Sequence, residues 1–470
     1  MPPVAGVTFA TVEELGRRLR ARELSPVALA EACLERISRV APKLWCFVNP
    51  TPQRALEEAR GAEAELARGR WRGPLHGIPY GLKDLVDTKG LATTFGARPY
   101  ATRVPDRDAT VQARLREAGA VLLGKLSMIE LAGGLGYHWA DAALNGACRT
   151  PWDLSRWAGG SSSGAASAVA GGLVSFAIGS ETWGSITCPA AFCGVTGLRP
   201  TYGVVSRHGA MPVSWTLDKL GPLCRSARDA ALVLRAIAGR DPRDPTSVDP
   251  PPGLDAVVPA AAKGLRAAVL GLPEKPPVSA DVKAIWEAAL ATLERLGLAL
   301  ERAKLPDLPY EDLAVLFIEA EAGTAFEDVI RSGRTRELSD RSHRERSPDD
   351  YLSRGSATDY VRAMRLRGDV QRALARFFER YDLVVAPNLP YVAPPVDESL
   401  DPLFDGSDPL GAAGNLAGLP ALALPMGFAG PGKLPVSMQL VGKPFDEARL
   451  LAAGALWQEE TRFHLERPPV

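Results

Sequence analysis

Two stretches near the start of the chain carry apolar residues at the spacing of an amphipathic helix. They cover residues 25–40 (SPVALAEACLERISRV) and 51–70 (TPQRALEEARGAEAELARGR). Ser25 and Thr51 each precede a proline, which is typical of a capping residue followed by proline at the first helical position. We therefore expect helices that begin at Pro26 and Pro52.

Beyond these helices the pattern changes to short apolar runs separated by helical patterns. Strands that alternate with helices predict an α/β protein with a largely parallel or mixed sheet. The runs that we interpret as buried strands are 76–87 (HGIPYGLKDLVD), 120–127 (AVLLGKLS), 173–181 (LVSFAIGSE) and 381–390 (YDLVVAPNLP).

The domain organisation depends on the proline-rich segment 241–259. A chain of 470 residues that is 46% hydrophobic can bury a large core, and its length alone suggests two or three domains. However, a strand pattern at 265–271 and a helical pattern at 279–297 continue the earlier alternation, so we interpret the segment as an extended loop. We expect one domain over 1–470, with a core at about 70–225, a variable helical region at 263–380 with a loop near 331–350, and a C-terminal sheet and helix region at 381–470.

Charge and cysteine content exclude several classes of protein. Lysine plus arginine and aspartate plus glutamate are balanced at 55 each, without the basic patch of a nucleic-acid-binding protein. No window reaches the roughly 18 apolar residues of a membrane span, and the N-terminus lacks a signal pattern, so we expect a cytoplasmic protein without membrane contact. Six scattered cysteines without CxxC spacing favour buried thiols over a zinc or disulfide site.

The stretch 156–172, RWAGGSSSGAASAVAGG, could be a flexible linker or a packed element. A Gly/Ser linker would be flanked by polar sequence, whereas this stretch continues directly into the apolar run at 173–181. Small side chains let backbones approach closely, and glycine beside serine exposes N–H groups and hydroxyls to a ligand. We interpret the stretch as packed.

Three chemistries could use these residues. Gly160–Gly164 fits a G-x-S-x-G nucleophile elbow with Ser162 as nucleophile, but a polar turn rather than a strand precedes it. Residues 119–126 approach a phosphate-binding loop, but Leu126 stands where Ser or Thr is needed. The third chemistry pairs serine with a buried lysine whose pKa is lowered, and Lys83 is the candidate. Residue physics alone leaves open that Lys83 is a surface residue on an edge strand. None of the five histidines has an obvious catalytic context.

Longer motifs resemble those of the amidase signature family. Residues 77–90 (GIPYGLKDLVDTKG) resemble its lysine motif, and 158–209 resemble its long serine- and glycine-rich signature. Residues 415–428 (NLAGLPALALPMGF) and 434–451 also match, so that the resemblance runs from about residue 10 to the C-terminus and is weakest at 240–380. It implies an α/β fold: a single large domain with a central mixed β-sheet flanked by helices on both faces.

The resemblance also assigns roles to residues. Ser185 would attack the carbonyl carbon, Ser161 on a cis peptide bond would carry the proton, and neutral Lys83 would accept it. Ser162 would support the triad, with Ser162 and Ser163 hydrogen-bonding Lys83 and nearby backbone. The implied oxyanion hole consists of the backbone N–H groups of Thr182, Trp183, Gly184 and Ser185.

Two departures from the family pattern bear on the substrate. Many members have Gly-Gly before the nucleophile, but here Trp183 puts a bulky ring beside the site. Members that act on carboxylate-bearing substrates tend to have arginine shortly after the nucleophile, where this chain has Thr187. We therefore expect a neutral, rather apolar amide as substrate. The loop 128–146 is expected to line the mouth of the site, with Gly133, Gly134, Tyr137 and Trp139 as candidate substrate contacts.

The sequence thus predicts a stand-alone amidohydrolase, monomer or homodimer, that needs no metal or cofactor. Carbamates and aryl esters present the same electrophilic carbonyl, so a urethanase or esterase is one alternative. Another is the A subunit of a tRNA-dependent amidotransferase, which would require a partner. A catalytically inactive, binding-only relative is disfavoured by the joint presence of Lys83, Ser161 and Ser185.

Overall fold

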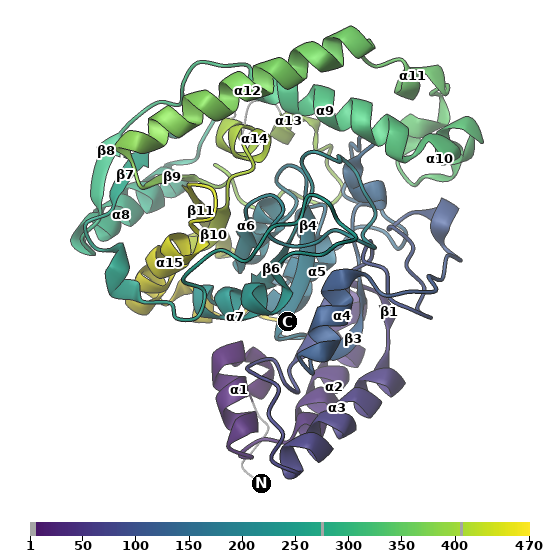
Figure 1. Cartoon of the computed structure of the whole chain (residues 1–470), viewed down its shortest axis with the longest axis vertical. Helices are drawn as coiled ribbons and strands as arrows, with labels where there is room; N and C mark the ends of the chain where they lie inside the picture. The colour runs from purple at the N-terminus through teal and green to yellow at the C-terminus, as the bar shows by residue number, and fades with distance from the viewer. Residues whose placement is uncertain (1–5, 274–276, 405–407) are drawn as a thin grey trace.

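A single mixed sheet organises the computed structural model, which describes residues 6–273, 277–404 and 408–470 (Figure 1). Its eleven strands follow the order β1-β3-β2-β4-β6-β5-β10-β11-β9-β7-β8 within these residues. The pairs of β2 with β3 and β4, and of β7 with β8 and β9, are parallel, and the other pairs are antiparallel. The strands are β1 (Phe47–Pro50), β2 (Pro79–Lys83), β3 (Val121–Leu126), β4 (Phe176–Glu181), β5 (Thr196–Arg199), β6 (Lys219–Cys224), β7 (Arg266–Val269), β8 (Ala299–Arg302), β9 (Leu383–Pro387), β10 (Ala421–Ala429) and β11 (Leu434–Gly442).

Helices cover both faces of this sheet. A Cβ added at Gly197 of β5 would meet Ala190 of α6, so this position faces α6. A Cβ added at Gly454 of α15 would meet Leu422 of β10, and Leu422 pairs with Leu198, the residue after Gly197 in β5. Because successive strand residues point to opposite faces, α6 and α15 lie on opposite sides of the sheet. The predicted α/β fold with a central mixed sheet is confirmed.

The helices differ in what they contact. Helices α5 and α6 pack on each other, as do α7 and α15, whereas α9, α12 and α14 form a separate layer at the top of Figure 1. The helices are α1 (Val12–Arg20), α2 (Pro26–Leu44), α3 (Pro52–Ala67), α4 (Thr110–Glu117), α5 (Ser163–Ala170), α6 (Thr187–Cys193), α7 (Ala227–Ile237), α8 (Ala280–Arg295), α9 (Tyr310–Ala325), α10 (Glu327–Arg331), α11 (Asp349–Leu352), α12 (Ala357–Arg380), α13 (Asp401–Phe404), α14 (Pro409–Leu416) and α15 (Glu447–Thr461).

The two N-terminal helices begin where the sequence places them. Helix α2 starts at Pro26, and the Ser25 hydroxyl accepts a hydrogen bond from the backbone N–H of Ala28. Helix α3 starts at Pro52, but the expectation that Thr51 caps it is wrong. The Thr51 hydroxyl donates instead to the carbonyl of Leu122 at 3.1 Å, because β3 lies beside the helix N-terminus.

The proline-rich segment carries neither a helix nor a strand from residue 241 to residue 258, all of which the structure describes. After it, β7 joins the same sheet, so the segment is a loop within one domain. Residues 331–350, expected as a loop, include the end of α10, two short 3-10 helices and the start of α11.

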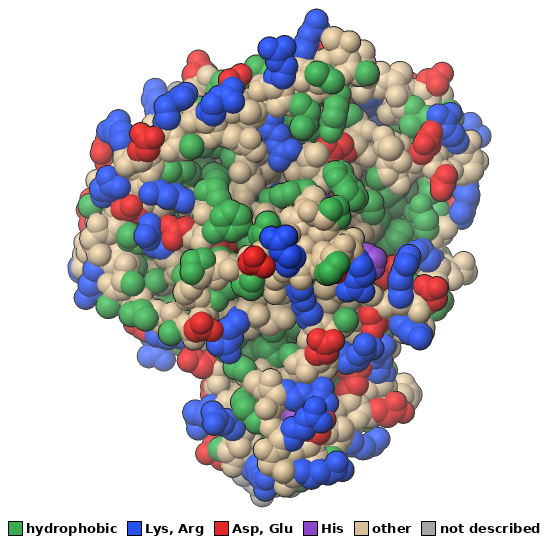
Figure 2. Space-filling model, in the orientation of Figure 1, with side chains coloured by type: hydrophobic (Ala, Val, Ile, Leu, Met, Phe, Trp, Pro, Cys, Tyr) green, Lys and Arg blue, Asp and Glu red, His purple; other side chains and the backbone are tan. Residues whose placement is uncertain are grey.

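The surface matches the balanced composition. Figure 2 shows lysine and arginine side chains interspersed with aspartate and glutamate over the visible face. Among the described helices, none combines the length and apolarity needed to cross a bilayer. Five of the six cysteines are buried and Cys188 is half-buried, as predicted for packed thiols.

Candidate active site

Lys83 is the last residue of β2 and lies in the interior of the sheet rather than at its edge. β2 runs between β3 and β4, and the side chain of Lys83 is fully buried. Its Nζ donates hydrogen bonds to the hydroxyls of Ser161 (2.7 Å), Ser162 (2.9 Å) and Ser180 (2.9 Å). Burial lowers the pKa of Lys83 well below its ordinary value of 10.5, and the Asp218 and Glu181 carboxylates only partly oppose this shift.

Ser161 lies in the turn that leads into α5, and the Gly160–Ser161 peptide bond is cis. Its carbonyl accepts a hydrogen bond from the N–H of Ile129 at 3.1 Å, which ties the turn to the loop after β3. Gly159 has φ +81°, and a Cβ there would come within 2.7 Å of the backbone of Pro189. Glycine at position 159 is therefore required by a close approach of the two backbones.

The two following serines behave differently. The Ser162 hydroxyl accepts from Lys83 and lies 3.1 Å from the carbonyl oxygen of Ser180, to which it donates. This is the supporting contact that we expected for Ser162. The Ser163 hydroxyl, in contrast, is buried without a hydrogen-bond partner among the described residues, so the expected contact to Lys83 or nearby backbone is wrong. Ser163 is the first residue of α5, and its side chain packs in the interior.

Ser185 lies in the turn between β4 and α6. Because β2 and β4 are parallel, their C-terminal ends meet at one edge of the sheet, which brings this turn close to Lys83. The carbonyl of Ser185 accepts from the N–H of Ser162 at 3.2 Å. The Ser185 side chain is mostly buried, with a residue exposure of 8%. The Ser185 turn and the Ser161 turn are thus joined directly.

The turn before Ser185 contains backbone N–H groups that form no backbone hydrogen bond among the described residues. Gly184 has φ +77°, and no atom lies within 4 Å of a Cβ built on it. No backbone hydrogen bond is formed by the N–H groups of Trp183, Gly184 and Ser185 within the described part of the chain. Backbone donors that converge in such a turn can stabilise a developing oxyanion.

Glu181 was not predicted, yet it holds the turn after Ser185. Its Oε2 accepts from the N–H groups of Ile186 (2.9 Å) and Thr187 (3.1 Å), and its Oε1 accepts from Arg199 (2.7 Å) and Asn415 (3.1 Å). Burial acts to raise the pKa of Glu181, but Arg199, Lys219 and the N–H group of Ile186 together outweigh it, and the pKa falls to about 2. An acidic residue at the end of a mostly apolar strand was the available signal, because a buried charge must be paired.

Asp218 is a second residue that sequence reasoning missed. Its Oδ1 accepts from the Thr182 hydroxyl at 2.6 Å, and its Oδ2 accepts from the N–H groups of Val213 (2.7 Å) and Ser214 (3.1 Å). The carboxylate thereby joins the proposed oxyanion turn to the loop before β6. No local pattern indicates this contact, since 36 residues separate Asp218 from Thr182.

The predicted substrate contacts divide between two cavities. Gly133, Gly134 and Tyr137 line a cavity of about 350 Å³ next to α9. The Tyr137 ring packs edge-on against Trp157, which precedes the Ser161 turn, with ring centres 6.3 Å apart. Trp139 is 39% exposed and lines a different cavity together with Trp45. The structure therefore places Tyr137 against Trp157, and it places Trp139 in a different cavity.

No group of three or more His, Cys, Asp or Glu side chains with the geometry of a metal site occurs in the ranges that the structure describes. The side-chain groups that contact the buried amine of Lys83 are the hydroxyls of Ser161, Ser162 and Ser180.

Known proteins share this architecture and much of the sequence. The Amidase family profile matches residues 28–451. The chain is 40% identical to the A subunit of glutamyl-tRNA(Gln) amidotransferase from Moorella thermoacetica, over 98% of both chains. The crystal structure of native peptide amidase from Stenotrophomonas maltophilia superposes with a TM-score of 0.83 at 33% identity, covering 100% of this chain and 99% of the other.

The crystal structure of the corresponding amidotransferase protein from Thermotoga maritima superposes with a TM-score of 0.80 at 30% identity, covering 97% of this chain and 96% of the other. These relatives include both a peptide amidase and an amidotransferase component, so they share a fold and a reaction class rather than one substrate. The chain belongs to the amidase signature family of enzymes, which act on amide C–N bonds.

Proposed function

We propose that this chain hydrolyses the C–N bond of a carboxamide through an acyl-enzyme on Ser185. The observation that carries the proposal is the burial of Lys83 with three serine hydroxyls as its hydrogen-bond partners. A lysine in this environment is neutral at a lower pH than usual and can accept a proton from Ser161.

The proposed proton movements balance in both half-reactions. Lys83 takes the hydroxyl proton of Ser161 while Ser161 takes that of Ser185, whose Oγ attacks the carbonyl carbon. The N–H groups of residues 182–185 stabilise the oxyanion, and the proton returns through Ser161 to the departing nitrogen as the C–N bond breaks. A water molecule then attacks the ester and donates its proton along the same path, which frees the carboxylic acid and restores Ser185.

A neutral amide is the first candidate substrate. Thr187 offers no charge at the position where an arginine would bind a substrate carboxylate. Tyr137, Trp157 and Phe192 belong to one apolar cluster beside the Ser161 turn, which suits an aryl or alkyl group. Carbamates and aryl esters carry the same carbonyl, and they remain candidates for the same pocket.

Glutamine, as substrate of an amidotransferase, is the second candidate. It is supported by the relatives, since proteins named as the A subunit of glutamyl-tRNA(Gln) amidotransferase match at 37–40% identity over 96–98% of this chain. In that case the chain would act with a partner and would release ammonia for transfer.

The deciding experiment compares four substrates with the purified chain. A neutral p-nitroanilide, a matched aryl carbamate, a matched aryl ester and glutamine are assayed with the wild type and with Ser185→Ala. We expect turnover of the anilide, and a loss of roughly 10⁴-fold or more in Ser185→Ala. Ser162→Ala should keep part of the activity, because Ser162 supports Lys83 without reacting.

Each other result has a clear meaning. Glutamine hydrolysis without anilide hydrolysis would favour the amidotransferase function, and a carbamate rate above the anilide rate would favour a urethanase. If Ser185→Ala stayed active while Ser162→Ala lost all turnover, the nucleophile elbow at Ser162 would replace the proposal. Circular dichroism of each variant checks that the fold is retained.

A further inference from the structure

A second cavity, of about 500 Å³, lies where four segments of the chain meet, and we call it the tryptophan cavity after Trp45 and Trp139, which line it. The segments are the end of α2, the loop 139–149, residues 339–341 and residues 396–397. Neither Ser161 nor Ser185 is among the residues that line it. Its volume falls in the range of small-molecule sites, about 300–1,000 Å³.

Trp45 occupies a strained position at this cavity. It follows α2 with φ +56° and ψ +33°, a left-handed conformation that helices usually end on with glycine or asparagine. The Ser127 hydroxyl donates to the Trp45 carbonyl at 2.7 Å and holds the backbone there. The side chain is nevertheless 45% exposed. A tryptophan that is kept at a strained and exposed position indicates that its indole has a role at the surface.

Both indoles are carried on anchored backbone. The Trp45 ring lies over Gly146, since a Cβ added there would come within 3.2 Å of the ring. Trp139 forms a β-bridge with Ser399 and is also exposed. The two aromatic rings therefore offer fixed apolar surfaces to a ligand in the cavity.

Four charged side chains line the same cavity without being paired. They are Asp141, Arg149, Arg341 and Asp397. No ion pair or side-chain hydrogen bond joins any of them to another residue that the structure describes. The Nε of Arg149 is moreover buried without a hydrogen-bond partner among these residues. A buried donor without an acceptor is costly, so this guanidinium calls for an acceptor that the chain itself does not supply.

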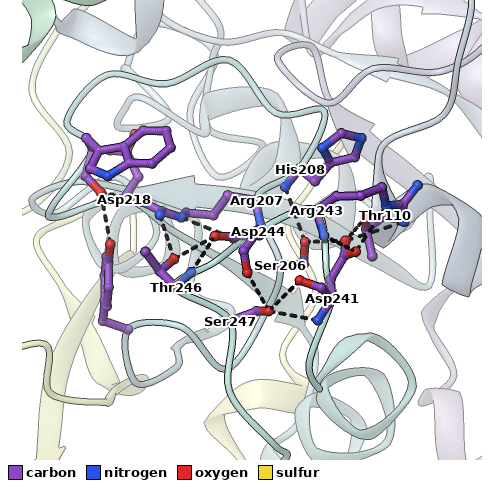
Figure 3. A network of polar contacts seen from close by, with 12 residues as sticks. Thr110, Ser206, Arg207, His208, Asp218, Asp241, Arg243, Asp244, Thr246 and Ser247 are labelled. Atoms are coloured by element: carbon purple, nitrogen blue, oxygen red, sulfur yellow. Dashed lines mark hydrogen bonds and ion pairs between the residues drawn. The ribbon is translucent and has the colours of Figure 1, made fainter.

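Charged side chains near another surface cavity are paired with one another, as Figure 3 shows. There the Arg207 guanidinium lies 3.6 Å from Asp244, and Arg243 Nε donates to Asp241 at 3.0 Å. Loops of this protein can thus satisfy their own charges. The four charges of the tryptophan cavity, in contrast, are available to a ligand.

We propose that the tryptophan cavity binds a zwitterionic α-amino acid with an apolar or aromatic side chain. Its carboxylate accepts from the guanidinium groups of Arg149 and Arg341. Its ammonium group donates to the carboxylates of Asp141 and Asp397 and is attracted to the indole faces. The side chain of the amino acid packs on the indoles.

Other ligand charges fit this lining less well. An anion would pair with the two arginines but would be repelled by the two aspartates, and a cation would meet the reverse. A neutral apolar molecule would cover the Arg149 Nε without giving it an acceptor. A zwitterion pairs with all four charges, because the lining carries two of each sign.

Isothermal titration calorimetry of the whole chain with L-phenylalanine tests the proposal. We expect saturable binding of one molecule per chain. Two analogues separate the contributions of the charges: 3-phenylpropionate lacks the ammonium group, and 2-phenylethylamine lacks the carboxylate. Each should bind at least about tenfold more weakly, because each leaves two charged side chains unpaired. None of the three compounds contains an amide or ester bond, so turnover at Ser185 does not interfere.

Substitutions locate the bound amino acid. Arg149→Met and Trp139→Ala should each raise the Kd for L-phenylalanine at least about tenfold. The control Arg60→Met removes an exposed arginine of α3 that forms no ion pair with a described residue, and Trp215→Ala removes an exposed tryptophan outside the cavity. Both controls should bind within about twofold of the wild type. Circular dichroism checks the fold, and Arg341→Met, at an exposed position, replaces Arg149→Met if that variant does not fold.

Any of three results would overturn the proposal: no saturable binding of L-phenylalanine, equal affinity for all three compounds, or an unchanged Kd in the cavity variants. A chain labelled at Ser185 by a fluorophosphonate should still bind L-phenylalanine with the same Kd. Loss of binding after labelling would place the amino acid at Ser185 and would also overturn the proposal. None of these measurements requires amide hydrolysis, so the amino-acid site and the proposed function are tested separately.

Discussion

At the residue scale, the environment of Lys83 determines the chemistry. The lysine can act as a base only when neutral, and burial lowers its pKa well below 10.5. The apparent kcat/KM should therefore rise as the pH rises through the Lys83 pKa and reach its plateau at a pH below 10.5. A pH–rate profile on the best substrate measures this. A profile still rising at that pH would mean that burial does not lower the pKa of Lys83.

Removing the charge of Asp218 tests in which direction this carboxylate shifts the pKa of Lys83. Its negative charge favours the protonated form of Lys83, so Asp218→Asn should move the rising limb of the profile to lower pH. We expect the rate at the plateau to fall as well, because Asp218 also holds Thr182, but the position of the limb reports only on Lys83. Asp255→Asn, which alters an exposed carboxylate in a surface ion pair, should leave the limb unchanged.

The pairing of Glu181 with Arg199 predicts a large effect on stability. Both side chains are fully buried, and Glu181→Gln would leave the Arg199 charge without its partner. We expect the free energy of unfolding at neutral pH to fall by about 3–5 kcal/mol, measured by urea denaturation. Glu287→Gln, in an exposed pair with Arg302, should change it by less than about 1 kcal/mol.

The pH dependence of this contribution follows from the lowered pKa. The folded pKa of Glu181 is about 2 and its ordinary value is 4.5, so the stabilisation is present above pH 4.5. It is lost as the pH falls toward 2, because both the folded and the unfolded forms are then protonated. The difference between wild type and Glu181→Gln should therefore shrink on acidification. A difference that stays constant from neutral pH to acid would contradict the assignment.

At the element scale, the small residues of 156–172 are explained by packing. A Cβ added at Gly164 in α5 would come within 2.4 Å of the Cys46 carbonyl oxygen and 2.5 Å of the Ser127 nitrogen. Both neighbours are backbone atoms in strand-flanking segments and cannot move aside. This helix is close to the strands because its residues are small, and that closeness brings Ser161 and Ser162 to Lys83.

Gly164→Ala should consequently lower the free energy of unfolding by about 1–3 kcal/mol. Gly61→Ala is the matched control, since Gly61 is an exposed residue of helix α3 with open space around it. The control should raise stability by about 0.5–1 kcal/mol, because alanine favours the helix. Denaturant unfolding of both variants gives the comparison, and equal effects at the two sites would refute the close packing of α5.

The sequence predicted these elements better than it predicted their contacts. Apolar runs located β2, β3, β4 and β9, since a strand buried on both faces needs apolar residues throughout. The contacts of Lys83 could not be derived this way, because they depend on β2 lying between β3 and β4. The family resemblance assigned Ser161 and Ser162 to Lys83, but no local signal distinguished Ser162 from Ser163, whose buried hydroxyl has no partner among the described residues.

At the scale of the whole molecule, the sheet order shows why the chain is one domain. Strands β9, β10 and β11, from the last quarter of the sequence, lie between β5 and β7. The same region supplies Asn415, which donates to Glu181 beneath the nucleophile turn. The catalytic core at 70–225 is therefore completed by residues that are more than 150 positions away, which composition and periodicity could not reveal.

This arrangement predicts how the chain responds to cutting. A fragment of residues 1–380 keeps Lys83, Ser161 and Ser185 but lacks β9–β11, so β5 loses a partner strand and β7–β8 are detached from the sheet. We expect this fragment to show no cooperative unfolding transition by circular dichroism and no labelling of Ser185 by a fluorophosphonate.

The matched control is a pair of co-expressed fragments, 1–249 and 250–470, which divide the proline-rich loop and leave every strand whole. That pair should associate, unfold cooperatively and react at Ser185, because the cut breaks no strand pairing. Cooperative unfolding and labelling of fragment 1–380 would instead mean that the core folds without the C-terminal strands, and the single-domain interpretation would be wrong.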